Sequence, residues 1–183
     1  MYFSKTGPEN TEETLKIALR EAEARGIRYL IVASTFGDTA LKAANLVKGK
    51  DIKLIVVTHN TGFKKPGEQE FREDVKSEVE KTGGIVYTGT MVLRGIGRGI
   101  KNKINFSHEE IIANVLRMFC QGIKVCVEIA AMASDAGLIP FSDVIAVGGT
   151  ARGADTACVI KADSSNNFFD IKIKEILVKP SEF

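Results

Sequence analysis

One stretch decides the fold: YLIVASTFGDTA, at residues 29–40. Residues 29–33 form a continuous apolar run, the pattern of a strand that is covered on both faces in a parallel sheet. A hydroxyl-rich turn with one glycine follows, and residues 39–48 then place Ala40, Leu41, Ala44 and Val47 at helical spacing. The chain therefore runs from a buried strand through a tight turn directly into a helix.

The same alternation continues on both sides of this stretch. Helical patterns cover residues 11–25, 68–81 and 107–137, the last with Gly122 as a point of interruption, and apolar strand patterns cover residues 54–57, 85–87 and 144–147. Residues 157–162 and 169–178 are two further strand patterns, and the second alternates as an edge or antiparallel strand does. We therefore predict one α/β domain over residues 1–183, a three-layer α/β/α sandwich whose mostly parallel sheet ends in antiparallel strands.

Composition and charge exclude several classes of protein. Apolar residues make up 44% and charged residues 26% of the chain, which is typical of a globular domain. No run of about 20 apolar residues exists, and no signal peptide opens the chain, so we expect no membrane association. The formal net charge of +2 is too small for a dedicated nucleic-acid-binding protein. Three cysteines at no zinc-like spacing indicate a cytoplasmic protein without a structural metal.

The turn at residues 34–39 is the first candidate site. Ligands of open α/β sheets gather beyond the carboxyl ends of the strands, and a helix N-terminus offers free backbone N–H groups to a phosphate. The alternative is that Asp38 or Thr39 only caps the helix. The segment is neither a P-loop nor a Gly-x-Gly-x-x-Gly dinucleotide motif.

Several motifs resemble the C-terminal α/β domain of pyruvate kinase. Residues 34–40 are similar to its Ser-Thr-x-Gly-x-Thr-Ala loop, and residues 55–60 to its second strand with a Thr-Pro-Asn end, although His59 replaces the proline. Residues 133–153 resemble its Gly-ending helix and Gly-Asp-x-Val-x-Val-x-Gly strand, with Ser142 in place of the first glycine. The resemblance covers roughly residues 13–160.

This resemblance implies a function for the turn. In many pyruvate kinases the domain is regulatory, and its Ser-Thr loop holds a phosphate of a sugar bisphosphate. The chain lacks the catalytic barrel, so kinase activity is not implied, and it looks like a stand-alone relative of the type associated with flavin mononucleotide (FMN). The resemblance therefore implies an FMN phosphate on residues 34–39. The alternative is a regulatory domain that binds a sugar phosphate or nucleotide and acts through a partner protein.

Other candidates lie around the same sheet edge. The basic, glycine-rich segment at residues 90–106 contains Arg98 and is expected to be a loop that either covers the phosphorylated ligand or is merely solvated. His59 is a candidate acid–base group, while nucleophilic hydrolase chemistry and single-stranded nucleic acid have little support. No set of residues in the sequence defines a catalysed reaction or its substrate. The candidate ligand-binding residues are Ser34, Thr35, Phe36, Gly37, Asp38, Thr39, Thr58, His59, Asn60, Arg98, Gly149, Thr150 and Arg152.

The helical pattern at residues 123–133 is apolar nearly all round. One face of a sheet covers only one side of such a helix, so we also expect the chain to form a homo-oligomer.

Overall fold

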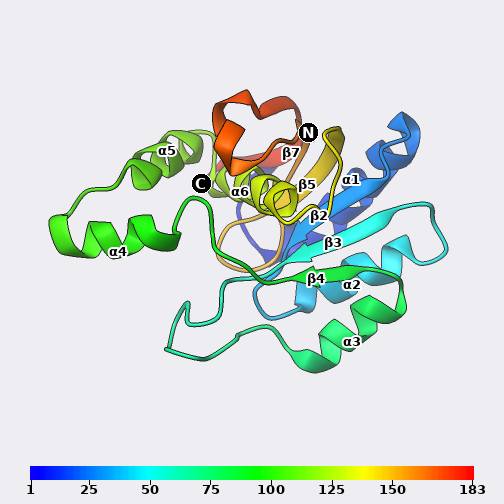
Figure 1. The fold of residues 1–183 in the computed structure, drawn as a ribbon. Helices are drawn as coiled ribbons and strands as arrows, with labels where there is room; N and C mark the ends of the chain where they lie inside the picture. Colours follow the sequence, from blue (N-terminus) through cyan, green and yellow to red (C-terminus); the bar gives the residue numbers. More distant parts are fainter.

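A seven-stranded sheet organises the molecule, and the computed structural model describes all 183 residues (Figure 1). Its strand order is β1-β7-β6-β5-β2-β3-β4. The strands are β1 (Tyr2–Lys5), β2 (Tyr29–Ala33), β3 (Lys53–Val57), β4 (Ile85–Tyr87), β5 (Asp143–Gly148), β6 (Thr156–Lys161) and β7 (Lys172–Glu182). The helices are α1 (Thr11–Arg25), α2 (Asp38–Val47), α3 (Glu73–Lys81), α4 (Gly95–Ile104), α5 (His108–Arg117) and α6 (Gln121–Asp135), with 3₁₀ helices η1 (Pro8–Asn10) and η2 (Ser165–Asp170).

The sheet confirms the predicted topology. Strands β5, β2, β3 and β4 pair in parallel, whereas β6 pairs antiparallel with both β5 and β7. Strand β1 was not predicted, and it pairs in parallel with the outer side of β7. Its four residues are mostly exposed and carry no apolar run, so no local pattern marks it as a strand.

Helices cover both faces of the sheet, as Figure 1 shows. Alternate side chains of the buried strand β2 point to opposite layers: Leu30 and Val32 pack with α1, α2 and α3, whereas Ile31 packs with α6. This alternation explains why the strand is apolar at every position, because each of its faces lies in a core of its own.

Two predicted elements differ from the structure. The pattern at residues 107–137 is divided into α5 and α6, with the break at residues 118–120 rather than at Gly122. The segment at residues 90–106 was predicted as a loop, but it contains α4, whose Ile96, Ile100 and Ile104 recur every four residues. Its three glycines lower helix propensity, and this hid the helical spacing.

The nearly all-round apolar helix α6 is covered within the chain. Its inner side packs on the sheet, and its outer side packs against Leu116 of α5, Phe168 of η2 and the segment that contains Met91 and Val92. The burial of α6 thus needs no second copy, and the expected homo-oligomer keeps no support from this helix. No helix of the structure has the length and apolarity needed to cross a bilayer.

Glycines allow α6 to lie very close to the sheet. A Cβ atom on Gly122 would collide with the side chain of Thr156 on β6, which is fully buried. A Cβ atom on Gly148 of β5 would come within 2.9 Å of both the Gly122 carbonyl oxygen and Val125 Cβ. The first turn of α6 is therefore held against β5 and β6 with almost no side chain between the backbones.

We predict that Gly122→Ala destabilises the protein by about 1 to 3 kcal/mol, the usual cost of overpacking a core. Gly99→Ala is the matched control, because Gly99 lies inside α4 with no atom within 4 Å of the added methyl group. Removing a glycine there should stabilise the helix by about 0.5 to 1 kcal/mol. Urea denaturation of both variants measures the difference, and equal midpoints would contradict the close contact.

Candidate ligand-binding site

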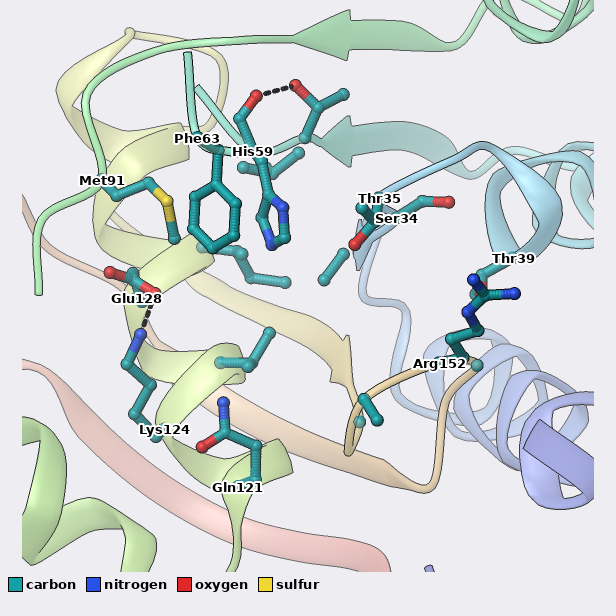
Figure 2. A pocket seen from close by; sticks show the side chains of 18 of the residues that line it. Ser34, Thr35, Thr39, His59, Phe63, Met91, Gln121, Lys124, Glu128 and Arg152 are labelled. Atoms are coloured by element: carbon teal, nitrogen blue, oxygen red, sulfur yellow. Dashed lines mark hydrogen bonds and ion pairs between the residues drawn. The ribbon is translucent and has the colours of Figure 1, made fainter. Parts of the chain in front are cut away.

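A cavity of about 300 Å³ lies at the carboxyl ends of β2, β3 and β5 (Figure 2). Ser34 follows β2, Thr58 follows β3 and Gly149 follows β5, so the parallel strands deliver their loops to one place. Helix α6 and the segments around Phe63 and Met91 complete the walls. The side chains and backbone that line it come from Ala33, Ser34, Thr35, Phe36, Asp38, Thr39, Val57, Thr58, His59, Phe63, Met91, Arg94, Arg117, Gln121, Lys124, Val125, Glu128, Ile129, Met132, Gly149, Ala151, Arg152 and Gly153.

The turn between β2 and α2 carries unpaired backbone donors. The N–H groups of Thr35, Phe36 and Gly37 have no acceptor within the protein, and the first turn of a helix adds further free N–H groups. Ser34 Oγ accepts a hydrogen bond from Ala40 N, at 3.3 Å, and thereby fixes the turn to the helix. The result is a row of donors at the positive end of the α2 dipole, the arrangement that binds anions.

Gly37 is required by the shape of this turn. Its φ angle is 108°, which side chains with a Cβ atom rarely adopt, and an added Cβ would lie 2.8 Å from Val75 Cγ1 of α3. Any larger residue would have to displace either the turn or α3.

Charged side chains surround the same turn. Asp38 does not cap α2; its Oδ1 lies 3.3 Å from Arg72 Nη1. Lys64 and Arg152 lie over the Phe36 ring, at 5.3 and 5.1 Å from its centroid, and Arg152 forms no ion pair. Arg152 thus lies beside the turn that leads into α2. The only carboxylate in the turn, Asp38, is thus paired with Arg72, whereas Arg152 has no anionic partner.

The loop at residues 149–153 is held by buried polar groups. Asp155 Oδ2 accepts from Thr150 N at 3.2 Å, and the hydroxyl of Thr11 on α1 accepts from Ala154 N at 3.0 Å. The Thr150 hydroxyl is buried without a partner and does not line the cavity.

His59 points into the cavity and is held on two sides. Its Nδ1 lies 2.9 Å from Glu70 Oε2, and its ring stacks on Phe63 with centroids 3.8 Å apart. Arg94 lies over the Phe63 ring, with its guanidinium carbon 4.2 Å from the ring centroid. Burial raises the pKa of Glu70, but the hydrogen bond with His59 and the ion pair with Lys64 outweigh this effect and hold that pKa below its usual value.

This arrangement defines what His59 can do. An ionised carboxylate fixes a proton on Nδ1, so Nε2, for which the protein supplies no partner, is left to accept or donate a hydrogen bond in the cavity. A histidine oriented in this way by a carboxylate has the geometry of an acid–base group.

The wall formed by α6 was missed by sequence reasoning. Gln121, Lys124 and Glu128 recur at spacings of three and four residues, so they share the face of α6 that lines the cavity. The available signal was the presence of polar residues inside a strongly apolar helical pattern, since buried polar side chains are more informative than exposed ones. We overlooked this face of α6 because we considered only the loops that follow the strands.

The structure brings together most of the predicted site residues but not all of them. Gly37 shapes the turn but does not line the cavity, and the Thr150 hydroxyl is buried away from the cavity. Asn60 and Arg98 line a second cavity of about 360 Å³ that shares Phe63, Met91 and Arg94 with the first. The predicted residues that line the main cavity are Ser34, Thr35, Phe36, Asp38, Thr39, Thr58, His59, Gly149 and Arg152.

No family model matches the chain. Among solved structures it is similar to a pyruvate kinase of Cryptosporidium parvum, with 19% identity and a TM-score of 0.43 over 83% of this chain and 22% of that chain. The complex of Cryptosporidium parvum pyruvate kinase with ADP matches with the same identity and TM-score over 83% of this chain and 23% of that chain. An O-ureido-L-serine synthase matches at 15% identity and a TM-score of 0.32, over 59% of this chain and 29% of its own.

The pyruvate kinase matches fall in the family whose C-terminal domain the motifs at residues 34–40 and 133–153 resemble. This chain spans less than a quarter of those enzymes, and at these identities the likeness concerns the fold alone.

Proposed function

We propose that the cavity binds a phosphorylated small molecule, with the phosphate on residues 35–39. The observation that carries this proposal is the row of unpaired N–H groups from Thr35 to Gly37 at the N-terminus of α2. Hydrogen bonds from such groups to a charged ligand contribute about 1.5 to 3 kcal/mol each. Arg152, which has no acidic partner, supplies a positive charge beside the same turn.

The charge of the whole cavity supports an anion. Four cationic residues and two acidic residues line it, and both acids already form ion pairs, Asp38 with Arg72 and Glu128 with Lys124. Arg94 and Arg152 form no ion pair at all. An anionic ligand would therefore meet more positive than negative charge in the cavity as a whole.

FMN is the phosphorylated ligand that we propose first, following the resemblance to stand-alone relatives of the pyruvate kinase domain. Its phosphate would occupy the turn at residues 35–39, and the remainder would extend along the wall that contains His59 and Phe63. A ligand of that size would reach toward the second cavity, which shares Phe63, Met91 and Arg94. Bound FMN would supply hydride and electron transfer.

One observation favours an additional protein partner. Many of the exposed large apolar side chains lie on α4 and α5 and in the connections that follow them, and these helices extend away from the sheet in Figure 1. Such concentration of apolar surface is typical of an interaction site. A regulatory domain that binds a sugar phosphate or nucleotide, or a homo-oligomer, would use this surface; the residues are Ile96, Ile100, Ile104, Phe106, Ile111, Val115, Met118 and Phe119.

The first prediction concerns the phosphate. FMN should bind at least tenfold more tightly than riboflavin, which lacks the phosphate, and Gly37→Val should remove this preference because it displaces the donor row. Gly49→Val is the matched control: Gly49 also has a positive φ angle, 76°, but its Cβ would meet open space outside the cavity. Fluorescence titration measures both ligands. Equal affinities for FMN and riboflavin in the wild type would show that the turn only begins a helix.

The second prediction concerns Asp38. Asp38→Asn should bind FMN equally well or more tightly, because it removes a carboxylate beside the phosphate and releases Arg72. Asp51→Asn is the control, since Asp51 also pairs with an arginine but precedes β3 at the opposite end of the sheet. A clear loss of FMN affinity in Asp38→Asn alone would mean that Asp38 contacts the ligand directly, contrary to the proposed arrangement.

A further inference from the structure

The wall opposite the phosphate turn contains a buried cation. Figure 2 shows Gln121, Lys124 and Glu128 along α6, facing Ser34, Thr35 and Arg152 across the cavity. Lys124 and Glu128 are only 4% and 2% exposed. An ammonium group has three hydrogen-bond donors, and Glu128 Oε2 is the only acceptor that the protein gives to Lys124 Nζ. Its other donors have no partner although the side chain is almost fully buried.

The two neighbours of Lys124 on α6 are each held in place by a hydrogen bond from another group. Glu128 Oε1 accepts from Leu93 N at 2.8 Å, which anchors the carboxylate. Gln121 Oε1 accepts from Arg117 Nε at 2.8 Å, so the amide NH₂ of Gln121 is the end without a partner. Two adjacent turns of α6 thus present an ammonium group and an amide donor to one cavity.

The same end of the cavity has surplus positive charge. Arg94 forms no ion pair, and Glu128 is close enough to affect its pKa, which burial and the neighbouring Arg98 lower. Glu128 is the one carboxylate on the cavity wall among Lys124, Arg94 and Arg117, and Arg117 also pairs with Glu110 outside the wall, at 3.8 Å, so Arg94 is the cation without an ion-pair partner. A buried ion pair is weak support for stability, because hydrophobic residues of similar volume often serve as well. Its position in a ligand cavity, with donors to spare, is better explained by binding.

We propose that Lys124, Gln121 and Arg94 form a second anion subsite, which binds a carboxylate at the far end of the ligand. This inference rests on the proposed phosphate site and names the ligand class it selects: a small phosphorylated carboxylic acid, which a cavity of about 300 Å³ would enclose. The ring of oxidised FMN offers only neutral carbonyl oxygens to the same donors and should gain less from them.

The test compares two ligands that share a phosphate, 3-phosphoglycerate and glycerol 3-phosphate, of which only the first has a carboxylate. Calorimetric titration of the wild type should give about tenfold to hundredfold tighter binding of 3-phosphoglycerate, the value of one or more charge-assisted hydrogen bonds. Arg152→Gln should weaken both ligands alike, because Arg152 lies at the phosphate end.

Variants of the ion pair separate ligand binding from a merely structural role. Lys124→Met with Glu128→Gln removes the pair without leaving a buried charge, and the amide can still accept from Leu93 N. The preference for 3-phosphoglycerate should disappear in this double variant. Glu128→Gln alone should increase the preference, because Lys124 then has no internal anion.

The outcomes distinguish the two proposals. If both phosphates bind the wild type equally well, or if the preference persists in the double variant, the carboxylate subsite is wrong while the phosphate site stands. If 3-phosphoglycerate, glycerol 3-phosphate and FMN all fail to bind the wild type, the proposed function is wrong and the carboxylate subsite is wrong with it. Unfolding midpoints of all variants establish that each remains folded at the titration temperature.

Discussion

The contact between α6 and the sheet is the constraint on which the arrangement of the site depends. Gly122 and Gly148 let the two backbones meet almost directly, and this fixes the start of the helix over β5 and β6. Because the helix begins there, its polar face at Gln121, Lys124 and Glu128 lies across from the end of β2 rather than above the middle of the sheet. The cavity lies between this face of α6 and the loops that follow β2, β3 and β5.

The two sides of the cavity achieve their polarity by different means. On the side of β2, the backbone itself supplies the donors, since a turn that includes Gly37 leaves its N–H groups without acceptors. On the side of α6, side chains supply the donors, and each is oriented by a neighbour, Lys124 by Glu128 and Gln121 by Arg117. His59, oriented by Glu70, lies between these two sides. Lys124, Gln121 and His59 are therefore each positioned before any ligand arrives.

The sequence was sufficient to predict the parallel core and the turn, because both rest on local patterns. Apolar runs mark strands covered on two faces, and the turn follows directly from the strand and precedes the helix. The partner of His59 was not predictable in the same way. Glu70 lies eleven residues further along the chain, in a connection without regular structure, and no periodicity joins the two.

The polar face of α6 was not predicted from the sequence, for a different reason. Lys124 and Glu128 are separated by four residues, the usual spacing of a solvated ion pair on a helix surface, so the apolar pattern around them was not taken as a sign that both are buried, as the structure shows. Helix α4 escaped prediction because three glycines interrupt its stripe of isoleucines. Local sequence thus indicated elements that bury apolar side chains, but not those whose role depends on contacts made far along the chain.

The short strand β1 has a consequence for how the molecule behaves among its own copies. A long open strand at the side of a sheet is a template for pairing between chains, and it promotes aggregation. Here β1, which has only four residues, covers only the last part of the eleven-residue β7, from Lys179 to Glu182, and the opposite side of the sheet ends in β4, which has only three residues. The part of β7 that β1 leaves open carries Lys172, Lys174 and Glu175, and charged side chains on an open strand oppose its pairing with a strand of another chain.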